Sequence, residues 1–289
     1  MSVQNSVEGN VSVWRIQPSQ GGFAGQLAAL WRHRNISAAL ARQVIADRAE
    51  RRILGLPWML VQPLLLAWPA VFVLGNVFKV SVAPLPLPMF IVSGLAVWIF
   101  VRRGIQFLSR SLGANRGLMG RVYIPGFLLL CASVSPAFIQ FLVFVVVLAV
   151  LAVYYGPIAG VFYIPFGWHF LALVPSLFLI VLLVIAVGCF TCVLFNLRDD
   201  ARLAMKYVIG GWMLITPIVY PPEVIPESHR WLLYINPLTP VVELFRYALL
   251  GYGTVDVASL SLAIAAIFVM LVVGGMIFTK MQNRLFDHI

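Results

Sequence analysis

The stretch GFLLLCASVSPAFIQFLVFVVVLAVLAV at residues 126–153 decides the fold of this chain. It contains no charged residue, and the uncharged stretch around it extends from Val122 to Leu197. A helix needs roughly 20 apolar residues to cross the hydrocarbon core of a bilayer. The uncharged stretch therefore predicts two membrane-spanning helices, at about 126–153 and 169–195.

Further apolar stretches lie on both sides of this one. Ile53–Val101 contains one charged residue, Lys79, and is long enough for two spans. Val257–Thr279 contains none and provides one more. We therefore predict an all-α integral membrane protein with six transmembrane helices, at about 54–78, 89–109, 126–153, 169–195, 205–222 and 258–279.

The fifth predicted span, 205–222, differs from the others. Only 16 uncharged residues separate Lys206 from Glu223. Such a stretch is short for a full crossing, and it is interrupted by a pair of glycines and by Pro217, which ends or kinks a helix. We therefore expect a tilted, broken or recessed helix at this position.

The basic residues predict how the spans are oriented. Three of the 20 Lys and Arg residues, Lys79, Arg230 and Arg246, fall on one side of the predicted spans. The positive-inside rule places the opposite side, and with it both termini, in the cytoplasm. The basic residues on that side are Arg15, Arg32, Arg34, Arg42, Arg48, Arg51, Arg52, Arg102, Arg103, Arg110, Arg116, Arg121, Arg198, Arg202, Lys206, Lys280 and Arg284.

The composition excludes an ordinary soluble domain. Hydrophobic residues make up 62% of the chain and charged residues 10%, whereas soluble domains carry about 25% charged residues. The net charge of +10 follows from the basic residues that set the topology, which also meet anionic lipid at the cytoplasmic leaflet. We therefore expect membrane lipid, and no nucleic acid, as a partner.

Three regions follow one another along the chain. Residues 1–24 predict a polar cytoplasmic tail, residues 25–52 an amphipathic cytoplasmic interface helix, and residues 53–289 a transmembrane domain. Leu27 and Trp31 share one face of the predicted amphipathic helix, and charged residues occupy the rest. A basic amphipathic helix before a span usually lies flat in the membrane interface. A solvated helix with no special role is the alternative.

The loop between the last two predicted spans, Glu223–Asp256, is long and predicts two short helices. Pro226 favours the start of the first helix, and Asn236-Pro237 combines a capping residue with a first-turn proline for the second. Glu243 and Arg246 are three residues apart on the second helix, so we expect them to form an ion pair.

Motifs for nucleotide binding or hydrolysis are absent from the sequence. It contains no GxxxxGK[ST], HExxH or GxSxG motif, so any ATP hydrolysis that this membrane protein depends on would take place on a separate ATPase chain. We expect no cofactor and no metal on this chain. An enzymatic alternative stays open, because Asp199 and Asp200 could hold a metal-diphosphate as in membrane transferases. That chemistry needs a second, facing carboxylate group, and the sequence offers none.

Several short motifs occur in a family-specific order between about Trp14 and Phe286. They are Ile16-Gln-Pro-Ser19, Leu30-Trp31-Arg32-His-Arg34, Leu54-Gly55-Leu-Pro-Trp58-Met-Leu-Val-Gln62-Pro63, Gly94-Leu-Ala-Val-Trp98, Ser111-Leu-x-x-Asn115, Arg121-Val-Tyr123-Ile-Pro125, Arg198-Asp199, Thr216-Pro217-Ile-Val-Tyr220-Pro221, Ile235-Asn236-Pro237-Leu238 and Phe245-Arg246. Together they resemble the membrane subunit of type-2 ABC exporters, in the branch that handles O-antigen, capsule and teichoic-acid-like polymers. The chain departs from that pattern at Arg48-Ala-Glu-Arg-Arg52, where the family usually has R-Y-x-x-[ST], and at Gly120-Arg121, where a Lys is common.

The resemblance implies a half-transporter without enzymatic activity of its own. Two copies would form a homodimer and recruit two ATP-binding cassette subunits, which would hold ATP and Mg. The assembly would move a lipid-linked polysaccharide across the bacterial inner (cytoplasmic) membrane. An exporter of drugs or small lipids would share this fold and is the alternative.

The resemblance also implies roles for individual residues. Spans one and five of each copy would line a channel in which aromatic rings stack on sugar faces, although ordinary packing or lipid contact is the alternative for each ring. The residues of this glycan path would be Trp58, Trp68, Phe72, Trp212 and Tyr220. The ATPase contacts would be Arg42, Arg48, Arg51, Asn115, Arg116, Arg121, Arg198 and Asp199. The periplasmic gate would comprise Glu227, Asn236, Pro237, Glu243 and Arg246.

Overall fold

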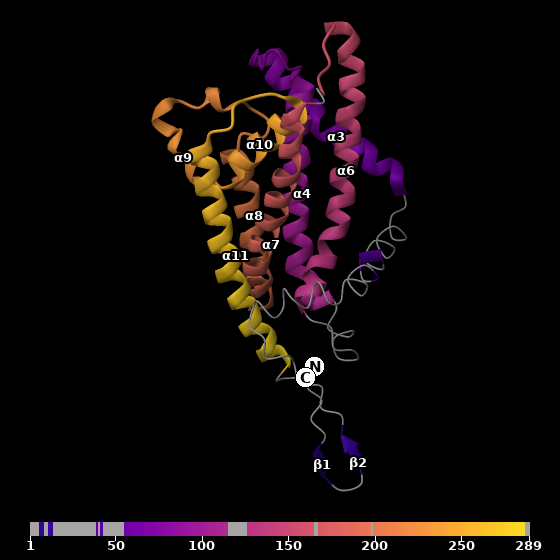
Figure 1. Cartoon of the computed structure of the whole chain (residues 1–289), viewed down its shortest axis with the longest axis vertical. Helices are drawn as coiled ribbons and strands as arrows, with labels where there is room; N and C mark the ends of the chain where they lie inside the picture. Colours follow the sequence, from indigo (N-terminus) through magenta and orange to yellow (C-terminus); the bar gives the residue numbers. More distant parts are fainter. Residues whose placement is uncertain are drawn as a thin grey trace.

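The computed structural model describes residues 6–8, 11–13, 39, 41–42, 55–114, 126–164, 167–197 and 199–286. Within this part the chain is almost entirely helical (Figure 1). The longer helices are α3 (Gly55–Phe72), α4 (Leu87–Ala114), α6 (Gly126–Ala159), α7 (Leu173–Leu197), α8 (Asp199–Ile215), α10 (Leu238–Leu250) and α11 (Val257–Phe286). The shorter ones are the π-helix η1 (Val73–Val77), the 3₁₀ helices η2 (Trp168–Ala172), η3 (Pro222–Val224) and η4 (Glu227–His229), and α9 (Trp231–Ile235).

Four helices of the described part are long and apolar enough to cross a membrane. They contain the stretches Leu87–Ser111, Leu129–Ala159, Trp168–Phe195 and Val257–Met281. Each coincides with one of the predicted spans at 89–109, 126–153, 169–195 and 258–279. The predicted first and fifth spans correspond to shorter apolar helices, at Val61–Val77 and Leu203–Ile215.

A small β-hairpin departs from the all-α prediction. Strands β1 (Ser6–Glu8) and β2 (Val11–Val13) pair antiparallel, with Ser6 opposite Val13 and Glu8 opposite Val11. Both strands fall in the segment predicted as a polar tail. The physical reason is local, because β-branched valines alternate with polar residues in Ser6–Glu8 and Val11–Val13, a pattern that suits a strand.

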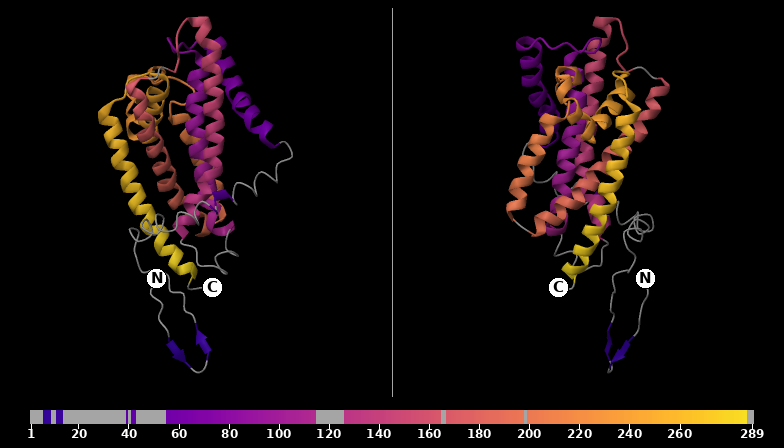
Figure 2. Two further views of the ribbon diagram at one scale, coloured as in Figure 1. Left: turned by 45° about the vertical axis from the view of Figure 1, so that its right-hand side comes forward. Right: turned by 90° about the vertical axis from the view of Figure 1, so that its left-hand side faces the viewer.

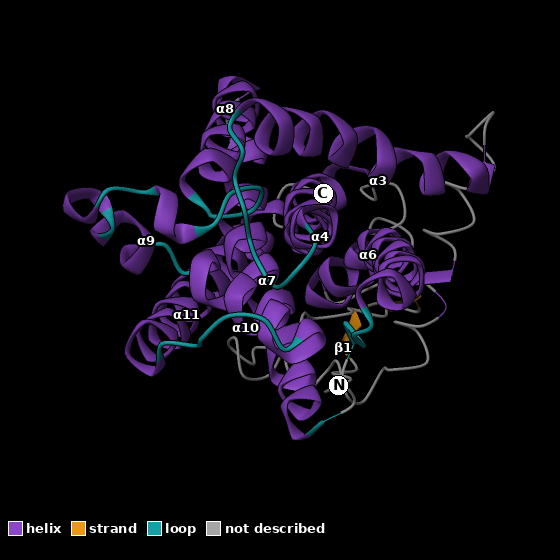
Figure 3. Cartoon of the chain, turned by 90° about the horizontal axis from the view of Figure 1, so that it is seen from above, coloured by secondary structure: helices purple, strands orange, loops and turns teal. Residues whose placement is uncertain are grey.

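Helix α4 lies at the centre of the bundle, with α6 and α7 against it and α3 and α10 in contact with it (Figure 3). Its side chains Phe90, Trp98 and Phe100 are among the largest that are fully buried. Helix α11 packs on α7 (Figure 2). Its outward residues, such as Phe268 and Val269, are apolar and exposed, as expected for a surface that meets lipid rather than water.

Polar contacts tie the helices together inside this apolar bundle. Arg103 of α4 donates hydrogen bonds to Gln62 of α3 (2.8 Å) and to Gln140 of α6 (3.0 Å). Ser109 of α4 donates to Thr191 of α7 (2.6 Å). Interhelical hydrogen bonds of this kind hold membrane bundles together where the hydrophobic effect contributes little.

Helices α3 and α8 lie on the same side of α4 (Figures 2 and 3). Helix α3 crosses the bundle obliquely and exposes Trp68 and Phe72. Helix α8 exposes Tyr207 and Leu214. We call these outward surfaces of α3 and α8 together the α3/α8 face. It is apolar, and no other described segment covers it.

The structure also shows how the predicted fifth span ends. Helix α8 begins at Asp199, six residues before the predicted start, and ends at Ile215, before Pro217. The chain then turns through Thr216–Tyr220 and continues into η3. Helix α8 is therefore short and ends before Pro217, as expected, but it continues without a break through Gly210 and Gly211. A tilted or recessed position stays a prediction. The helix ends near the end of the bundle where α4 and α11 begin (Figure 1). We call this end of the bundle the α10 end.

Candidate functional site

Asn236, between α9 and α10, anchors the end of α8 by its side chain. The indole Nε1 of Trp212 donates to Oδ1 of Asn236 at 2.8 Å, and Nδ2 of Asn236 donates to Oγ1 of Thr216 at 2.8 Å. The same Oδ1 accepts the backbone N–H of Leu238 at 3.1 Å, where α10 begins. An Asn side chain that bonds the backbone two residues later is a common turn device. The Asn236 side chain therefore fixes the start of α10 and also holds that start against the end of α8.

Arg246 of α10 makes the second connection to the end of α8. Its side chain is 2% exposed. The guanidinium donates to the carbonyl oxygens of Pro217 (2.8 Å), Ile218 (2.6 Å) and Phe90 (3.4 Å) and to the hydroxyl of Ser93 (3.3 Å). It also lies 3.7 Å from the centre of the Phe90 ring. We call these five residues the Arg246 cluster.

The prediction that Glu243 and Arg246 form an ion pair is wrong. Among the described residues, the ion pair within 4.0 Å is instead Arg230–Glu227, at 3.7 Å. The guanidinium of Arg246 is directed into the bundle, toward carbonyl oxygens that the turn after α8 leaves without helical partners. A fork of five N–H donors suits such a set of acceptors.

Gly94 allows the Arg246 cluster to form. A Cβ atom at this position of α4 would lie 2.5 Å from Nη2 of Arg246 and 2.9 Å from the carbonyl carbon of Ile218, with the Ile218 oxygen closer still. The backbone of the turn after α8 therefore packs directly on the backbone of α4. Only glycine leaves room for this approach.

Burial changes the electrostatics of α10. It raises the pKa of the Glu243 carboxyl to about 7, although the nearby positive charge of Arg246 acts in the opposite direction. Burial also lowers the pKa of the Arg246 guanidinium to about 9, so it stays cationic at neutral pH. Glu243 therefore exchanges a proton near physiological pH, whereas Arg246 keeps a fixed charge.

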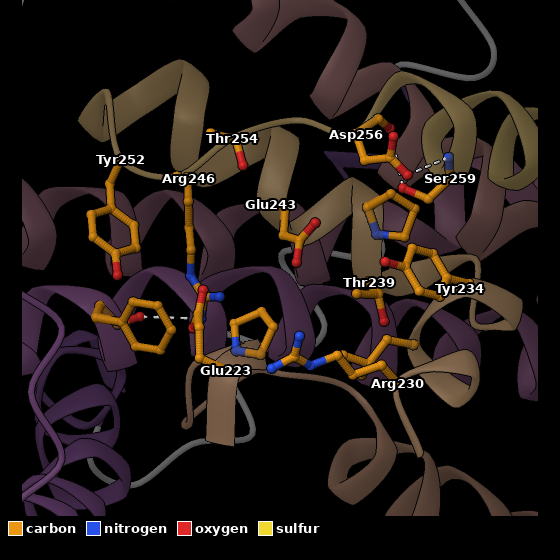
Figure 4. Close-up of a pocket in the computed structure, with 15 residues that line it drawn as sticks. Glu223, Arg230, Tyr234, Thr239, Glu243, Arg246, Tyr252, Thr254, Asp256 and Ser259 are labelled. Atoms are coloured by element: carbon orange, nitrogen blue, oxygen red, sulfur yellow. Dashed lines mark hydrogen bonds between the residues drawn. The ribbon is translucent and has the colours of Figure 1, made fainter. Parts of the chain in front are cut away.

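A cavity of about 440 Å³ lies between α9, α10, η3 and the start of α11 (Figure 4). We call it the α10 pocket. Its wall combines carboxylates, hydroxyls, arginines and aromatic rings, from Phe90, Pro222, Glu223, Arg230, Leu233, Tyr234, Thr239, Pro240, Glu243, Arg246, Tyr252, Gly253, Thr254, Asp256 and Ser259. The volume falls within the range of roughly 300–1,000 Å³ typical of small-ligand sites.

The predicted gate residues divide between these features. Asn236 and Arg246 bind the end of α8, Glu243 lines the α10 pocket, and Glu227 is exposed and pairs with Arg230. Pro237 directly precedes α10. The structure thus brings most of these residues to one place, and their role as a gate stays a prediction.

The residues of the predicted glycan path lie in two different environments. Trp68 and Phe72 are exposed on α3. Trp212 and Tyr220 are partly buried and bonded, since Trp212 donates to Asn236 and Tyr220 donates to the Leu214 carbonyl at 2.6 Å. The side chain of Trp58 lies outside the described residues.

Most of the predicted ATPase contacts fall outside the described residues: Arg48, Arg51, Asn115, Arg116, Arg121 and Arg198. Arg42 is exposed and helical, and Asp199 is the first residue of α8. The described residues contain no group of three or more His, Cys, Asp and Glu side chains that could hold a metal ion.

Sequence reasoning missed the partners of Arg246 and the pocket hydroxyl of Thr239. The sequence held two signals of the Arg246 contacts, because Gly94 and Thr216-Pro217 both belong to the motifs that carry the family resemblance. Neither motif predicts that an arginine would bind there, because the hydrogen-bond acceptors are mainly backbone carbonyls, which any residue provides.

Comparison with known proteins identifies the family. The family description "ABC-2 type transporter" matches residues 35–250. The chain is 25% identical over 240 residues to an O-antigen export system permease protein RfbA of Klebsiella pneumoniae, covering 82% of this chain and 88% of that one. It is 27% identical over 219 residues to the polysialic acid transport protein KpsM of Escherichia coli, covering 74% and 81%. In agreement with the resemblance of its motifs, the chain belongs to the ABC-2 type transporter family.

Proposed function

We propose that the chain is the membrane-spanning subunit of an ATP-driven exporter that moves a lipid-linked polysaccharide across the bacterial inner membrane. The observation that carries this proposal is the match to two permeases named for O-antigen export and polysialic acid transport, over most of their lengths. In this proposal all six apolar helices cross the membrane, both termini are cytoplasmic, and the α10 end faces the periplasm.

The proposal includes a homodimer formed through the α3/α8 face. This face exposes apolar side chains, and a Cβ at Gly210 or Gly211 would meet no atom within 4 Å. Small residues on an exposed membrane helix let a second helix approach closely. A Gly210→Leu variant is expected to lower the dimer fraction in native mass spectrometry without changing the helical content. An unchanged dimer fraction would exclude this face as the interface.

The proposal assigns ATP and Mg to two separate ATP-binding subunits that dock on the end of the bundle opposite the α10 end. The supporting observation is that the sequence has no phosphate-binding loop of the Walker type. Asp199→Asn is expected to reduce ATP hydrolysis only in the complex with the ATPase. A metal-dependent transferase activity of the purified chain alone, abolished by this variant, would instead establish the enzymatic alternative.

The glycan path is proposed along the α3/α8 face. Trp68 and Phe72 offer exposed rings there, and sugar rings present apolar C–H faces that stack on such rings. The path carries few charges, which suits a polymer that is recognised by stacking and hydroxyl groups.

Deletion of the gene tests the whole proposal. Surface glycan and intracellular lipid-linked material would be assayed together in the same cells. Loss of the surface polymer with accumulation of the finished lipid-linked chain inside would support glycan export. Loss of both would indicate a biosynthetic enzyme, and an unchanged glycan profile would indicate an exporter of drugs or small lipids.

A further inference from the structure

The α10 pocket contains a buried hydroxyl group without a partner. Thr239 is 4% exposed, and its Oγ1 has no hydrogen-bond partner among the described residues. Thr239 lines the pocket close to Tyr234 of α9 (Figure 4). Leaving a buried polar atom unpaired costs free energy, and native structures rarely do so without a reason. A ligand in the pocket would supply the missing hydrogen bond.

Glu243 presents a second polar group to the same cavity. It is four residues after Thr239 on α10, so the two side chains share one face of the helix. Its carboxylate makes no hydrogen bond and no ion pair within 4.0 Å to other described residues, and Figure 4 shows it directed toward the middle of the cavity.

Other charged groups of the wall are already engaged. Arg246 donates to the carbonyl oxygens of the Arg246 cluster. Asp256 accepts the backbone N–H groups of Ala258 and Ser259 at the start of α11. Arg230 donates to the Ile225 carbonyl and pairs with Glu227. The groups left for a ligand among the described residues are thus two hydroxyls, two carboxyls and two tyrosines, from Thr239, Thr254, Glu223, Glu243, Tyr234 and Tyr252.

This set of groups fits a sugar ring. Hydroxyl and carboxyl groups exchange hydrogen bonds with sugar hydroxyls, and the tyrosine rings offer flat surfaces to its C–H faces. An amine would pair with Glu223 or Glu243, although Arg230 and Arg246 offset part of the negative charge of the wall, so a polyamine serves as a comparison ligand. Tyr234 is 53% exposed, so its ring is accessible from the solvent at the α10 end.

We propose that the α10 pocket is a saccharide-binding site that holds one sugar ring, with Thr239 and Glu243 bonded to its hydroxyls and Tyr234 packed on its face. This inference rests on the proposed export of a glycan and adds a binding site at the proposed periplasmic end. A sugar bound there would contact α9, α10 and the start of α11 at the same time. The ring would be held beside the residues that anchor α8.

Ligand titration with the full chain in lipid nanodiscs tests this site. The probes are D-glucose, D-galactose, D-mannose and N-acetyl-D-glucosamine, with glycerol and spermidine as comparison ligands, followed by saturation-transfer difference NMR. Thr239→Val keeps the side-chain shape and removes an atom that has no partner, so folding is expected to be preserved. Loss of one or two hydrogen bonds is expected to raise the Kd of the bound sugar about three- to tenfold. Tyr234→Ala, at an exposed position, is expected to raise it by a similar factor.

Ser261→Ala is the matched control. Ser261 is on α11 near the same end, bonds only to the Ala258 carbonyl and does not line the pocket. Sugar binding that Thr239→Val and Tyr234→Ala weaken and Ser261→Ala leaves unchanged would support the site. Binding of spermidine alone, binding of glycerol as tight as that of the sugars, absence of sugar binding, or equal effects of all three variants would overturn it.

The outcome is separable from that of the proposed function. If gene deletion abolishes the surface polymer while the purified chain binds no sugar at this pocket, glycan export stands and the site is refuted. If gene deletion leaves the surface glycans unchanged, glycan export itself fails, whatever the titration shows.

Discussion

Replacement of Gly94 by alanine is the sharpest test of how the end of α8 is held. The added Cβ would lie 2.5 Å from Nη2 of Arg246 and 2.9 Å from the carbonyl carbon of Ile218. The arginine head could move aside, but the backbone of the turn after α8 has little freedom to do so. We therefore expect this substitution to separate α8 from α4 and to break the hydrogen bond between Arg246 and Ile218.

The magnitude follows from three contributions. Overpacking a buried site costs about 1–3 kcal/mol, and loss of a hydrogen bond from a charged donor costs about 1.5–3 kcal/mol. Alanine is better than glycine in a helix by about 1 kcal/mol, which offsets part of this cost. The net loss of unfolding free energy is therefore about 1.5–5 kcal/mol, which lowers the melting temperature by roughly 3–20 °C.

The assay is thermal unfolding of the purified chain in detergent, followed by circular dichroism. Ser261→Ala is the control, because the Ser261 hydroxyl is exposed on α11 and bonds only to the Ala258 carbonyl. The control is expected to melt at the wild-type temperature or slightly above it. Equal melting temperatures for Gly94→Ala and the wild type would refute the conclusion that close backbone contact at Gly94 positions the end of α8.

Three further substitutions test the same end of the bundle. Arg246→Met leaves the carbonyls of Pro217 and Ile218 without a donor and should cost about 3–5 kcal/mol in denaturant unfolding; a loss below about 1 kcal/mol would contradict this. Asn236→Ala unpairs the Trp212 indole and the start of α10 and should cost about 2–4 kcal/mol, with Ser261→Ala as an inert comparison. The raised pKa of Glu243, about 7, means that the folded chain holds this proton more tightly than the unfolded chain. Stability should therefore fall by up to about 3 kcal/mol as pH rises from about 4.5 to 7, and unfolding of Glu243→Gln across this range should lack that slope.

Much of the bundle could be predicted from the sequence because lipid imposes a simple rule. Uncharged stretches of sufficient length become helices: the predicted span 89–109 falls inside α4, and the predicted span 169–195 covers most of η2 and of α7. The ends were less accurate. Helix α6 continues to Ala159, six residues beyond the predicted end, because Pro157 and its apolar neighbours do not stop it.

Local turn chemistry also carried through to the structure. Asn236-Pro237 predicted the start of the second short helix in the loop Glu223–Asp256, and α10 begins at Leu238. Pro226 predicted the first, and the short helix η4 begins at Glu227. These signals act over a few residues, so they do not depend on how the rest of the chain folds.

The partners of Arg246 could not be predicted, because sequence spacing favoured a neighbour on the same helix. Glu243, three residues away, was the natural candidate. The actual acceptors include Phe90, which is 156 residues away in the chain, and Ile218, which is 28 away. Every residue has a backbone carbonyl, so the residue type does not predict which carbonyl accepts a hydrogen bond. Long-range contacts of this kind depend on how the whole bundle packs.

The Arg246 cluster also has a consequence for how the chain is made. Phe90, Ser93 and the turn after α8 are synthesised before Arg246. Every acceptor of the cluster is therefore without its donor until Arg246 has been added to the chain. Insertion of α4, α6 and α7 into the membrane needs only their apolar residues. Closure of the α10 end is therefore a late step of biogenesis, and a nascent chain arrested before residue 246 would be inserted with this end still open.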